Sequence, residues 1–193
     1  MNYPDLLILR HGQTEWNLAK RVQGELDSPL TPLGRAQAAA QGRLLASFGI
    51  AGWDVWTSPQ GRAADTAQIA LGPVAALRHD PRLAEITIGH WSGLYRHDIA
   101  AEVPHLFEAQ DDLAWYNHAP DGEGLEALYT RTGSFLAELT RPSVIVTHGI
   151  TSRMLRCHAL GLDAGAFDKL PGGQGVVFHL SGGHQTLLSE VET

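Results

Sequence analysis

The sequence predicts an α/β fold in which helices cover both faces of a mostly parallel sheet. Short runs that are apolar at successive positions recur along the chain, and their length suits strands buried on both faces. Helical patterns lie between these runs, and such alternation is typical of a parallel sheet packed between helices. The chain has 193 residues and is 44% hydrophobic, which is enough for one core. We therefore expect a single domain over residues 1–193.

The strands are predicted from the apolar runs in chain order. Four clear runs are Leu6–Leu9, Asp54–Thr57, Ser143–Thr147 and Gly175–Leu180. Two weaker stretches, Val74–Leu77 and Leu187–Val191, predict further short strands, the second at an edge of the sheet.

The helices are predicted from start signals and apolar spacing. Thr31-Pro32 combines a capping residue with a proline at the first helical position, which is a common helix start. Residues at every fourth position follow it: Ala36, Ala40, Leu44 and Phe48. Ser58-Pro59 has the same pattern and predicts a second helix through Ala63, Ala67 and Ala70. An apolar stripe predicts a third helix from Leu125 to Leu139, and a last helix is expected from Thr151 to Leu160, before Gly161.

The segment from His97 to Glu123 does not fit this alternation. It combines two prolines with Trp115, Tyr116 and several acidic residues. We expect a helical insertion that lies over one end of the sheet.

The charge balance narrows the class of partner. Lys and Arg number 14 against 21 Asp and Glu, a formal charge of −7, whereas nucleic-acid-binding domains are usually basic. There is no basic cluster for an acidic membrane and no apolar segment of membrane-spanning length. The single Cys157 cannot form an internal disulfide, and the apolar run near the N-terminus is too short for a signal sequence. We expect a cytoplasmic protein that acts on a small molecule.

Three predicted strands end in polar residues of an unusual kind. The first is followed by Arg10-His11-Gly12, the second by Ser58-Pro59 with Arg62 one turn later, and the third by His148-Gly149. Ligands of open α/β sheets bind beyond the carboxyl ends of the strands. Two Arg and two His at this edge predict a phosphate site, because one guanidinium group can donate two parallel hydrogen bonds to phosphate oxygens. We also expect main-chain N–H donors from Gly12 and Gly149, and the positive end of the helix after Ser58, at the phosphate.

The same residues predict a reaction. Neighbouring positive charge lowers the pKa of His11 and keeps its lone pair available for attack. The leaving alcohol needs a proton, and Glu85, in an apolar setting after Pro81, is the candidate general acid. Rival carboxylates are Glu15, Glu102, Glu108 and Glu123.

The motifs resemble the histidine phosphatase superfamily, whose members include cofactor-dependent phosphoglycerate mutases. The first block is Leu9 to Asn17, read LRHGQTEWN. The further blocks are Gln23-Gly24 with Asp27 to Thr31, Thr57-Ser58-Pro59 with Arg62-Ala63, Glu85 with Gly89, Trp91 and Gly93, and Val146 to Gly149. The five blocks occur in the family's order and cover most of the chain.

The resemblance implies specific roles and a specific architecture. His11 would form a phosphohistidine, Arg10, Arg62 and His148 would complete the phosphate pocket, and Glu85 would donate the proton. It further implies substrate contacts by Asn17, Gln23, Gly24 and Gly149. Asn17 could instead only cap a turn. For Gln23, the sequence leaves it equally open whether the side chain contacts substrate. The implied fold is a three-layer α/β/α sandwich with a lid-like insertion at about residues 97–123, and no metal or other cofactor is implied.

Departures from the mutase pattern favour hydrolysis of small phosphomonoesters. Mutases carry Arg directly after the acid and Tyr two residues further on, where this chain has Ile86 and Ile88. The predicted insertion contains no Arg, so it lacks the side chains with which a mutase would bind the second anionic group of a bisphosphorylated intermediate. Phosphoglycerate mutase activity, or a phosphate-binding regulatory protein of low activity, are the alternatives. The ten His show no metal-ligand spacing, and the sequence leaves the oligomeric state open, with a homodimer as one option.

Overall fold

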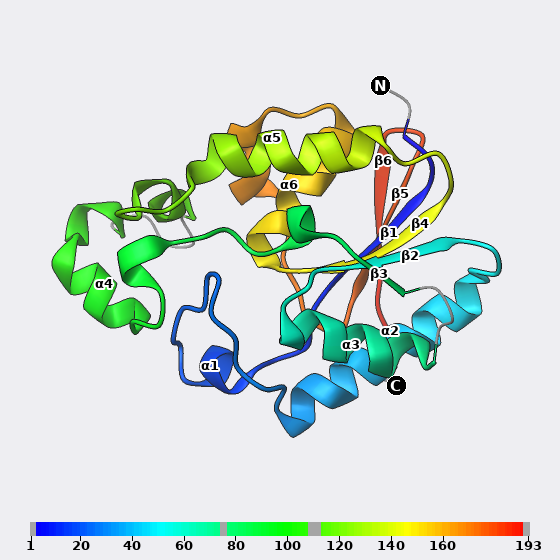
Figure 1. Cartoon of the computed structure of the whole chain (residues 1–193), viewed down its shortest axis with the longest axis horizontal. Helices are drawn as coiled ribbons and strands as arrows, with labels where there is room; N and C mark the ends of the chain where they lie inside the picture. The colour runs from blue at the N-terminus through cyan, green and yellow to red at the C-terminus, as the bar shows by residue number, and fades with distance from the viewer. Residues whose placement is uncertain (1–2, 74–76, 108–112, 191–193) are drawn as a thin grey trace.

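The computed structural model describes residues 3–73, 77–107 and 113–190. Within them six strands form one sheet in the order β3-β2-β4-β1-β5-β6 (Figure 1). The strands are β1 (Leu6–Arg10), β2 (Asp54–Thr57), β3 (Leu77–His79), β4 (Ser143–Thr147), β5 (Val177–Ser181) and β6 (His184–Leu188). The four strands from β3 to β1 are parallel, and β5 and β6 are antiparallel additions. The predicted α/β class with a mostly parallel sheet is confirmed.

Helices cover both faces of the sheet, as the unbroken apolar strands require. Alternate residues of β1 point to opposite sides, so Leu6 and Ile8 join one core cluster while Leu7 and Leu9 join another. The first cluster includes side chains of α5 (Gly124–Ala137) and α6 (Gly149–Leu160), and the second includes side chains of α2 (Pro32–Phe48) and α3 (Gly61–Leu71). The result is a three-layer α/β/α sandwich (Figure 1).

The remaining elements are short. They are α1 (Glu15–Leu18), α4 (Arg96–Glu102) and the 3₁₀ turns η1 (Pro81–Leu83), η2 (Gly89–Trp91), η3 (Pro104–Leu106), η4 (Ala114–His118) and η5 (Ala164–Lys169). Most lie between β3 and α5, and three of them, α4, η3 and η4, lie in the region where the insertion is predicted. Its described part packs through a separate apolar cluster in which the rings of Trp91 and Trp115 lie 6.0 Å apart.

The start of α2 is confirmed and its buried face is corrected. Thr31 Oγ1 accepts a hydrogen bond from the N–H of Gly34 at 3.0 Å, with Pro32 in the first turn. The buried positions are Gly34, Ala38, Gln41 and Leu45 rather than the predicted Ala36, Ala40, Leu44 and Phe48. The reason is close backbone contact, because a Cβ on Gly34 would lie 2.0 Å from the carbonyl oxygen of Gln13.

Two other predicted helix starts are wrong by two residues. Helix α3 begins at Gly61, because Ser58 Oγ accepts a hydrogen bond from the N–H of Gln60 and holds the preceding loop outside the helix. Helix α6 begins at Gly149 instead of Thr151, with His148 as its N-cap residue. It ends at Leu160, before Gly161, as predicted, and Gly161 has the left-handed conformation.

The weaker strand predictions need adjustment at their ends. Strand β3 spans Leu77–His79, so it only touches the predicted Val74–Leu77, and residues 74–76 lie outside the described residues. Strand β6 spans His184–Leu188 rather than 187–191, and residue 191 is likewise outside them. Strand β5 begins two residues after the predicted Gly175.

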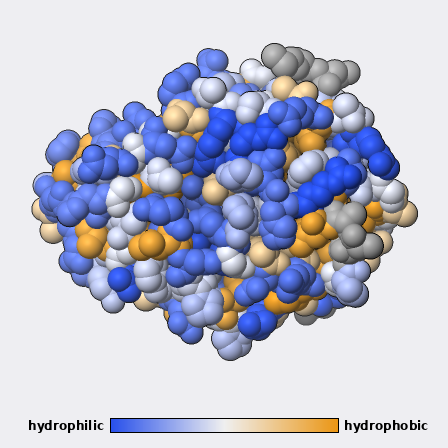
Figure 2. All heavy atoms as spheres, in the orientation of Figure 1, coloured by the Kyte–Doolittle hydropathy of each residue, from blue (hydrophilic) through white to orange (hydrophobic). Residues whose placement is uncertain are grey.

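The surface drawn in Figure 2 is mainly polar, with apolar side chains scattered among polar ones. In the described part of the chain, no helix combines the length and the apolar character needed to cross a bilayer.

We predict that Thr31→Ala lowers the free energy of unfolding by about 1 kcal/mol, because α2 loses its N-terminal cap. Ser47→Ala is the matched control, since its hydroxyl bonds only the carbonyl of Leu44 at the exposed end of the same helix. Urea unfolding should show the Thr31 loss and almost no change for the control. Equal effects of the two substitutions would contradict the capping role.

Candidate active site

A pocket of about 300 Å³ opens at the carboxyl ends of the parallel strands. Seven of the predicted site residues line it: Arg10, His11, Asn17, Gln23, Gly24, Arg62 and Glu85. The imidazole of His148 is fully buried directly behind, with its ring centroid 5.2 Å from that of His11. The structure therefore brings together residues that are far apart in the sequence.

His11 is fixed by the strand that precedes it. Its N–H donates to the carbonyl of Thr147 at 2.9 Å, which continues the pairing of β1 with β4. Its side-chain Nδ1 lies 2.7 Å from the carbonyl oxygen of Gly12. A carbonyl oxygen only accepts, so Nδ1 carries the hydrogen and Nε2 keeps its lone pair.

Gly12 allows this loop to pack against the start of α2. A Cβ at Gly12 would lie 2.1 Å from the carbonyl oxygen of Gly34, so a larger residue would force the two segments apart. The N–H of Gly12 donates to Thr66 Oγ1 at 3.1 Å. The expectation that this N–H is a phosphate donor is thus corrected, because α3 already uses it.

Three buried nitrogen atoms beside His11 have no hydrogen-bond partner among the described residues: Arg10 Nε, Arg62 Nε and His148 Nδ1. Arg62 is 1% exposed and uses its Nη atoms for the carbonyls of Gly24 and Leu26 and for Asp27. Leaving a buried donor unpaired costs about 1–3 kcal/mol. Unpaired nitrogens around one imidazole are therefore what a site for an anion requires.

Both histidines are held neutral. Burial lowers the pKa of His11 well below its usual value, and the positive charges of Arg10 and Arg62 lower it further. Burial and the charge of Arg62 likewise lower the pKa of His148, whose Nε2 lies 2.7 Å from Ser58 Oγ. The direction predicted for His11 is confirmed, although burial is a larger cause than the neighbouring charge.

Glu85 is densely hydrogen-bonded rather than unpaired in an apolar setting. Its carboxylate accepts the N–H groups of Gly149, Ile150 and Thr151 at 2.9–3.2 Å. It also accepts hydrogen bonds from the hydroxyl of Thr151 and from the N–H of Ile86, the residue that follows Glu85. The first turn of α6 thus binds this carboxylate.

Two expectations about helix ends and backbone donors are corrected by this geometry. The N–H of Gly149, expected at the phosphate, serves Glu85 instead. The N-terminus of α3, also expected at the phosphate, faces Asp27, whose Oδ1 lies 3.3 Å from the N–H of Arg62. Each of these two helices therefore directs its positive N-terminal end toward a carboxylate, Glu85 for α6 and Asp27 for α3.

The structure shows the capping role of Asn17, whereas its substrate contact stays a prediction. Its Oδ1 accepts the N–H of Thr14 and its N–H donates to Thr14 Oγ1, which caps α1. The residue also lines the pocket. Gln174 donates to Asn17 Oδ1 at 3.1 Å and to the carbonyl of His11 at 3.3 Å. No sequence pattern indicated Gln174, since it lies in a loop far along the chain.

Other pocket residues were missed as well: Lys20, Arg21, Val22 and Arg96. Tyr116, which the sequence analysis placed in the predicted insertion, also lines the pocket. Arg96 is the first residue of α4 and lies one position before the predicted insertion, so counting Arg only within residues 97–123 overlooked it. Burial raises the pKa of Tyr116 to about 12, so its phenol stays protonated. The pocket thus contains more positive charge than the phosphate site alone predicted.

The rival carboxylates that the structure describes do not line this pocket. None of Glu15, Glu102 and Glu123 is among its lining residues, and Glu108 lies outside the described residues. Among the described residues, no group of three or more His, Cys, Asp or Glu is arranged to hold a metal ion.

Comparisons with known proteins agree on one family. The family model described as "Histidine phosphatase superfamily (branch 1)" matches residues 6–190. Glucosyl-3-phosphoglycerate phosphatase of Mycobacterium tuberculosis (strain ATCC 25618 / H37Rv) is 36% identical over 160 residues, covering 75% of this chain and 70% of that protein. A probable phosphoglycerate mutase of Serratia proteamaculans (strain 568) is 34% identical over 170 residues, covering 84% and 78%. The solved structure of a mycobacterial glucosyl-3-phosphoglycerate phosphatase with VO3 has a TM-score of 0.80 at 33% identity, covering 97% of this chain and 98% of that one.

We predict that the imidazoles of His11 and His148 remain neutral at pH values where the denatured chain titrates, near 6.5. Because only the denatured chain takes up these protons as the pH falls below 6.5, the free energy of unfolding should rise with pH across that window. Two-dimensional NMR titration, assigned with His11→Asn and His148→Gln variants, measures both groups directly. An inflection of either resonance at or above pH 6.5 in the folded protein would contradict the burial argument.

Proposed function

Because the chain belongs to the histidine phosphatase superfamily and is an enzyme of its phosphatase and phosphoglycerate mutase-like kind, we propose that it hydrolyses small phosphomonoesters through a phosphohistidine on His11. The free Nε2 of His11 beside three unpaired buried nitrogens carries the proposal. A neutral nucleophile next to vacant donors suits a phosphoryl group, whose oxygens accept hydrogen bonds while its phosphorus is attacked.

In the first step the lone pair of His11 Nε2 attacks phosphorus. The bond from phosphorus to the leaving oxygen breaks, and a proton from Glu85 passes to that oxygen. The alcohol departs, leaving phosphohistidine and the Glu85 carboxylate. Arg10 and Arg62 neutralise the phosphoryl oxygens, and His148 donates from Nδ1 when the hydroxyl of Ser58 donates to its Nε2.

In the second step water attacks the phosphohistidine from the side that the alcohol has left. The bond between phosphorus and Nε2 breaks, and Glu85 takes a proton from the water. Inorganic phosphate leaves, His11 is neutral again, and Glu85 carries the proton that it will donate in the next cycle. The carboxylate acts as acid and then as base in the same position.

The extra cations favour a substrate with a second anionic group. Lys20, Arg21 and Arg96 line the pocket beyond the phosphate residues, so a carboxylate on the alcohol portion would find a positive partner. The names of the relatives include a phosphatase and a mutase of phosphoglycerate-containing compounds. We propose phosphomonoesters that carry a carboxylate as the substrate class.

Mutase activity remains the second candidate, and Arg96 is the observation in its favour. Against it, Ile86 and Ile88, at the positions where mutases carry Arg and Tyr, are fully buried in the apolar cluster beneath α4. A bisphosphorylated intermediate would have to reorient in the pocket without the Arg and Tyr side chains that bind it in mutases. Hydrolysis is therefore the reaction that these contacts support better.

We predict that His11→Ala lowers hydrolysis of p-nitrophenyl phosphate by about 10³-fold or more, because the nucleophile is lost. His184→Ala, an exposed His on β6, is the control and should retain activity. Acid-labile, base-stable label from ³²P-substrate should be trapped on the wild type and absent from His11→Ala. Label that persists in that variant would place the nucleophile elsewhere, and tight phosphate binding without turnover in the wild type would instead support a regulatory protein.

We predict that Arg96→Gln raises KM for 3-phosphoglycerate by about 10-fold, the effect of losing one charged hydrogen bond of about 1.5 kcal/mol. KM for p-nitrophenyl phosphate, which has no carboxylate, should change by less than about two-fold on the same grounds. Arg35→Gln, an exposed Arg on α2, is the control. Equal effects on both substrates would count against the carboxylate contact, and formation of 2-phosphoglycerate by the wild type would establish mutase activity.

A further inference from the structure

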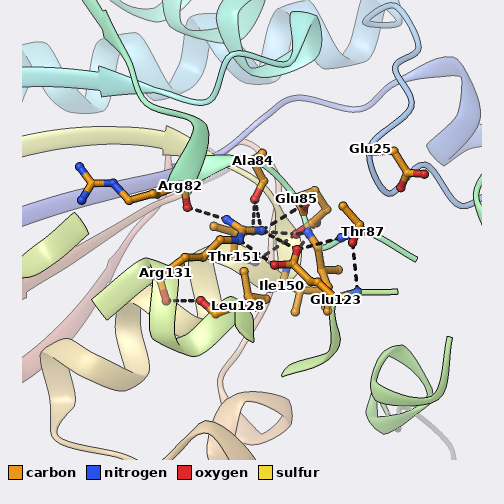
Figure 3. A network of polar contacts seen from close by, with 12 residues as sticks. Glu25, Arg82, Ala84, Glu85, Thr87, Glu123, Leu128, Arg131, Ile150 and Thr151 are labelled. Carbon is orange, nitrogen blue, oxygen red and sulfur yellow. Dashed lines mark hydrogen bonds and ion pairs between the residues drawn. The ribbon is translucent and has the colours of Figure 1, made fainter. Parts of the chain in front are cut away.

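The segment that carries Glu85 has no regular secondary structure of its own. It lies between η1 and η2, and its carbonyl groups cannot be paired by a strand or helix. Instead the guanidinium of Arg131, on α5, reaches across and donates to the carbonyls of Arg82 at 2.6 Å and Ala84 at 2.9 Å. It also donates to the carbonyl of Glu85 itself at 3.3 Å. Figure 3 shows this guanidinium at the centre of the network.

Arg131 is itself held by a paired contact with Glu123, the residue before α5. Arg131 Nε donates to one carboxylate oxygen and Nη2 to the other, each at 2.8 Å. The two side chains are only 21% and 18% exposed. Two parallel hydrogen bonds between charged groups fix the plane of the guanidinium as well as its position.

Glu123 also holds the chain on the far side of Glu85. Its Oε1 accepts the N–H of Thr87 at 2.9 Å, and its own N–H donates to Thr87 Oγ1 at 3.0 Å. The ion pair therefore grips the backbone both before and after Glu85 (Figure 3). The side chain of Glu85 is gripped separately by the first turn of α6.

We propose that Arg131 and Glu123 are positioning residues, which hold the carboxyl group of the general acid Glu85 within reach of the leaving oxygen of the substrate. The inference rests on the proposed function. Neither residue lines the pocket, so neither contacts the ligand, and their hydrogen bonds reach the site through the segment that carries Glu85. A displacement of the acid by about 1 Å is enough to reduce proton transfer by about 10²-fold.

The leaving group distinguishes positioning from simple support of the fold. An alkoxide must be protonated as it departs, so hydrolysis of an alkyl phosphate such as glycerol 2-phosphate depends on the acid. p-Nitrophenolate is a stable anion and leaves without a proton. Damage to the fold lowers kcat/KM for both substrates together, whereas displacement of Glu85 lowers it for the alkyl phosphate alone.

The test compares kcat/KM for these two substrates in four variants. Glu85→Gln sets the reference ratio for loss of the acid. Arg131→Gln should lower the rate on glycerol 2-phosphate by about 30-fold or more and the rate on p-nitrophenyl phosphate by less than about three-fold. Combining Arg131→Gln with Glu85→Gln should add no further change in the ratio beyond Glu85→Gln alone, because the two act as one unit.

The matched control is Arg82→Gln. Arg82 lies on the same segment and forms ion pairs with Asp80 and Glu138, yet its side chain makes no contact with Glu85 among the described residues. Its ratio of the two rates should equal that of the wild type. If Arg131→Gln does not fold, as judged by circular dichroism, Arg131→Lys and Glu123→Gln are read by the same criterion.

The outcomes separate the two proposals. A wild type that hydrolyses neither substrate, or a Glu85→Gln variant with an unchanged ratio, would overturn the proposed catalytic roles. A changed ratio in Glu85→Gln together with an unchanged ratio in the Arg131 and Glu123 variants would overturn the positioning role alone. A ratio that changes equally in Arg82→Gln would also overturn it, since the effect would then belong to the whole segment.

Discussion

The chemistry depends on one constraint, which is that an uncharged imidazole must be buried among positively charged groups. His11 meets it because its Nδ1 hydrogen is bound by the carbonyl of Gly12, which points Nε2 into the pocket. That carbonyl is placed by the contact between Gly12 and Gly34, where no side chain would fit. The orientation of the proposed nucleophile is therefore set by the packing of α2 against the end of β1 as much as by its own chemistry.

The carboxyl groups near the site face helix ends, and the positively charged guanidinium groups are left for the ligand. Helix α6 directs its first N–H groups to Glu85, and α3 directs its own to Asp27. Neither helix end is left for a phosphate, so the proposed anion binding depends on Arg10, Arg62 and the imidazoles. This division explains how a chain with a formal charge of −7 presents a positive pocket.

The layered fold and the residues at the strand ends could be predicted from the sequence, because both follow from local patterns. Apolar runs define strands, and the carboxyl ends of neighbouring parallel strands must meet at one edge. The surroundings of Glu85 could not be predicted, since they depend on where α6 begins and on a guanidinium from α5. Arg96 and Gln174 were missed for the same reason, as the loops that deliver them have no periodic signal. The helix start predicted at Ser58-Pro59 was wrong because the same residue pattern also suits a turn, in which the Ser hydroxyl accepts the N–H two residues later.

The strand order has a consequence for how the protein is made. Strand β1 is synthesised before its two neighbours in the sheet, β4 and β5, from which β2 and the helices α2, α3 and α5 separate it along the chain. Until then its backbone groups have no partners, and the carbonyl of His11 has no Gln174 to bind it. The nascent chain must keep an apolar strand away from other chains until β4 and β5 are available, and such non-local pairing is slow to form. The surroundings of His11 therefore stay incomplete until β4, β5 and the loop that carries Gln174 have been synthesised.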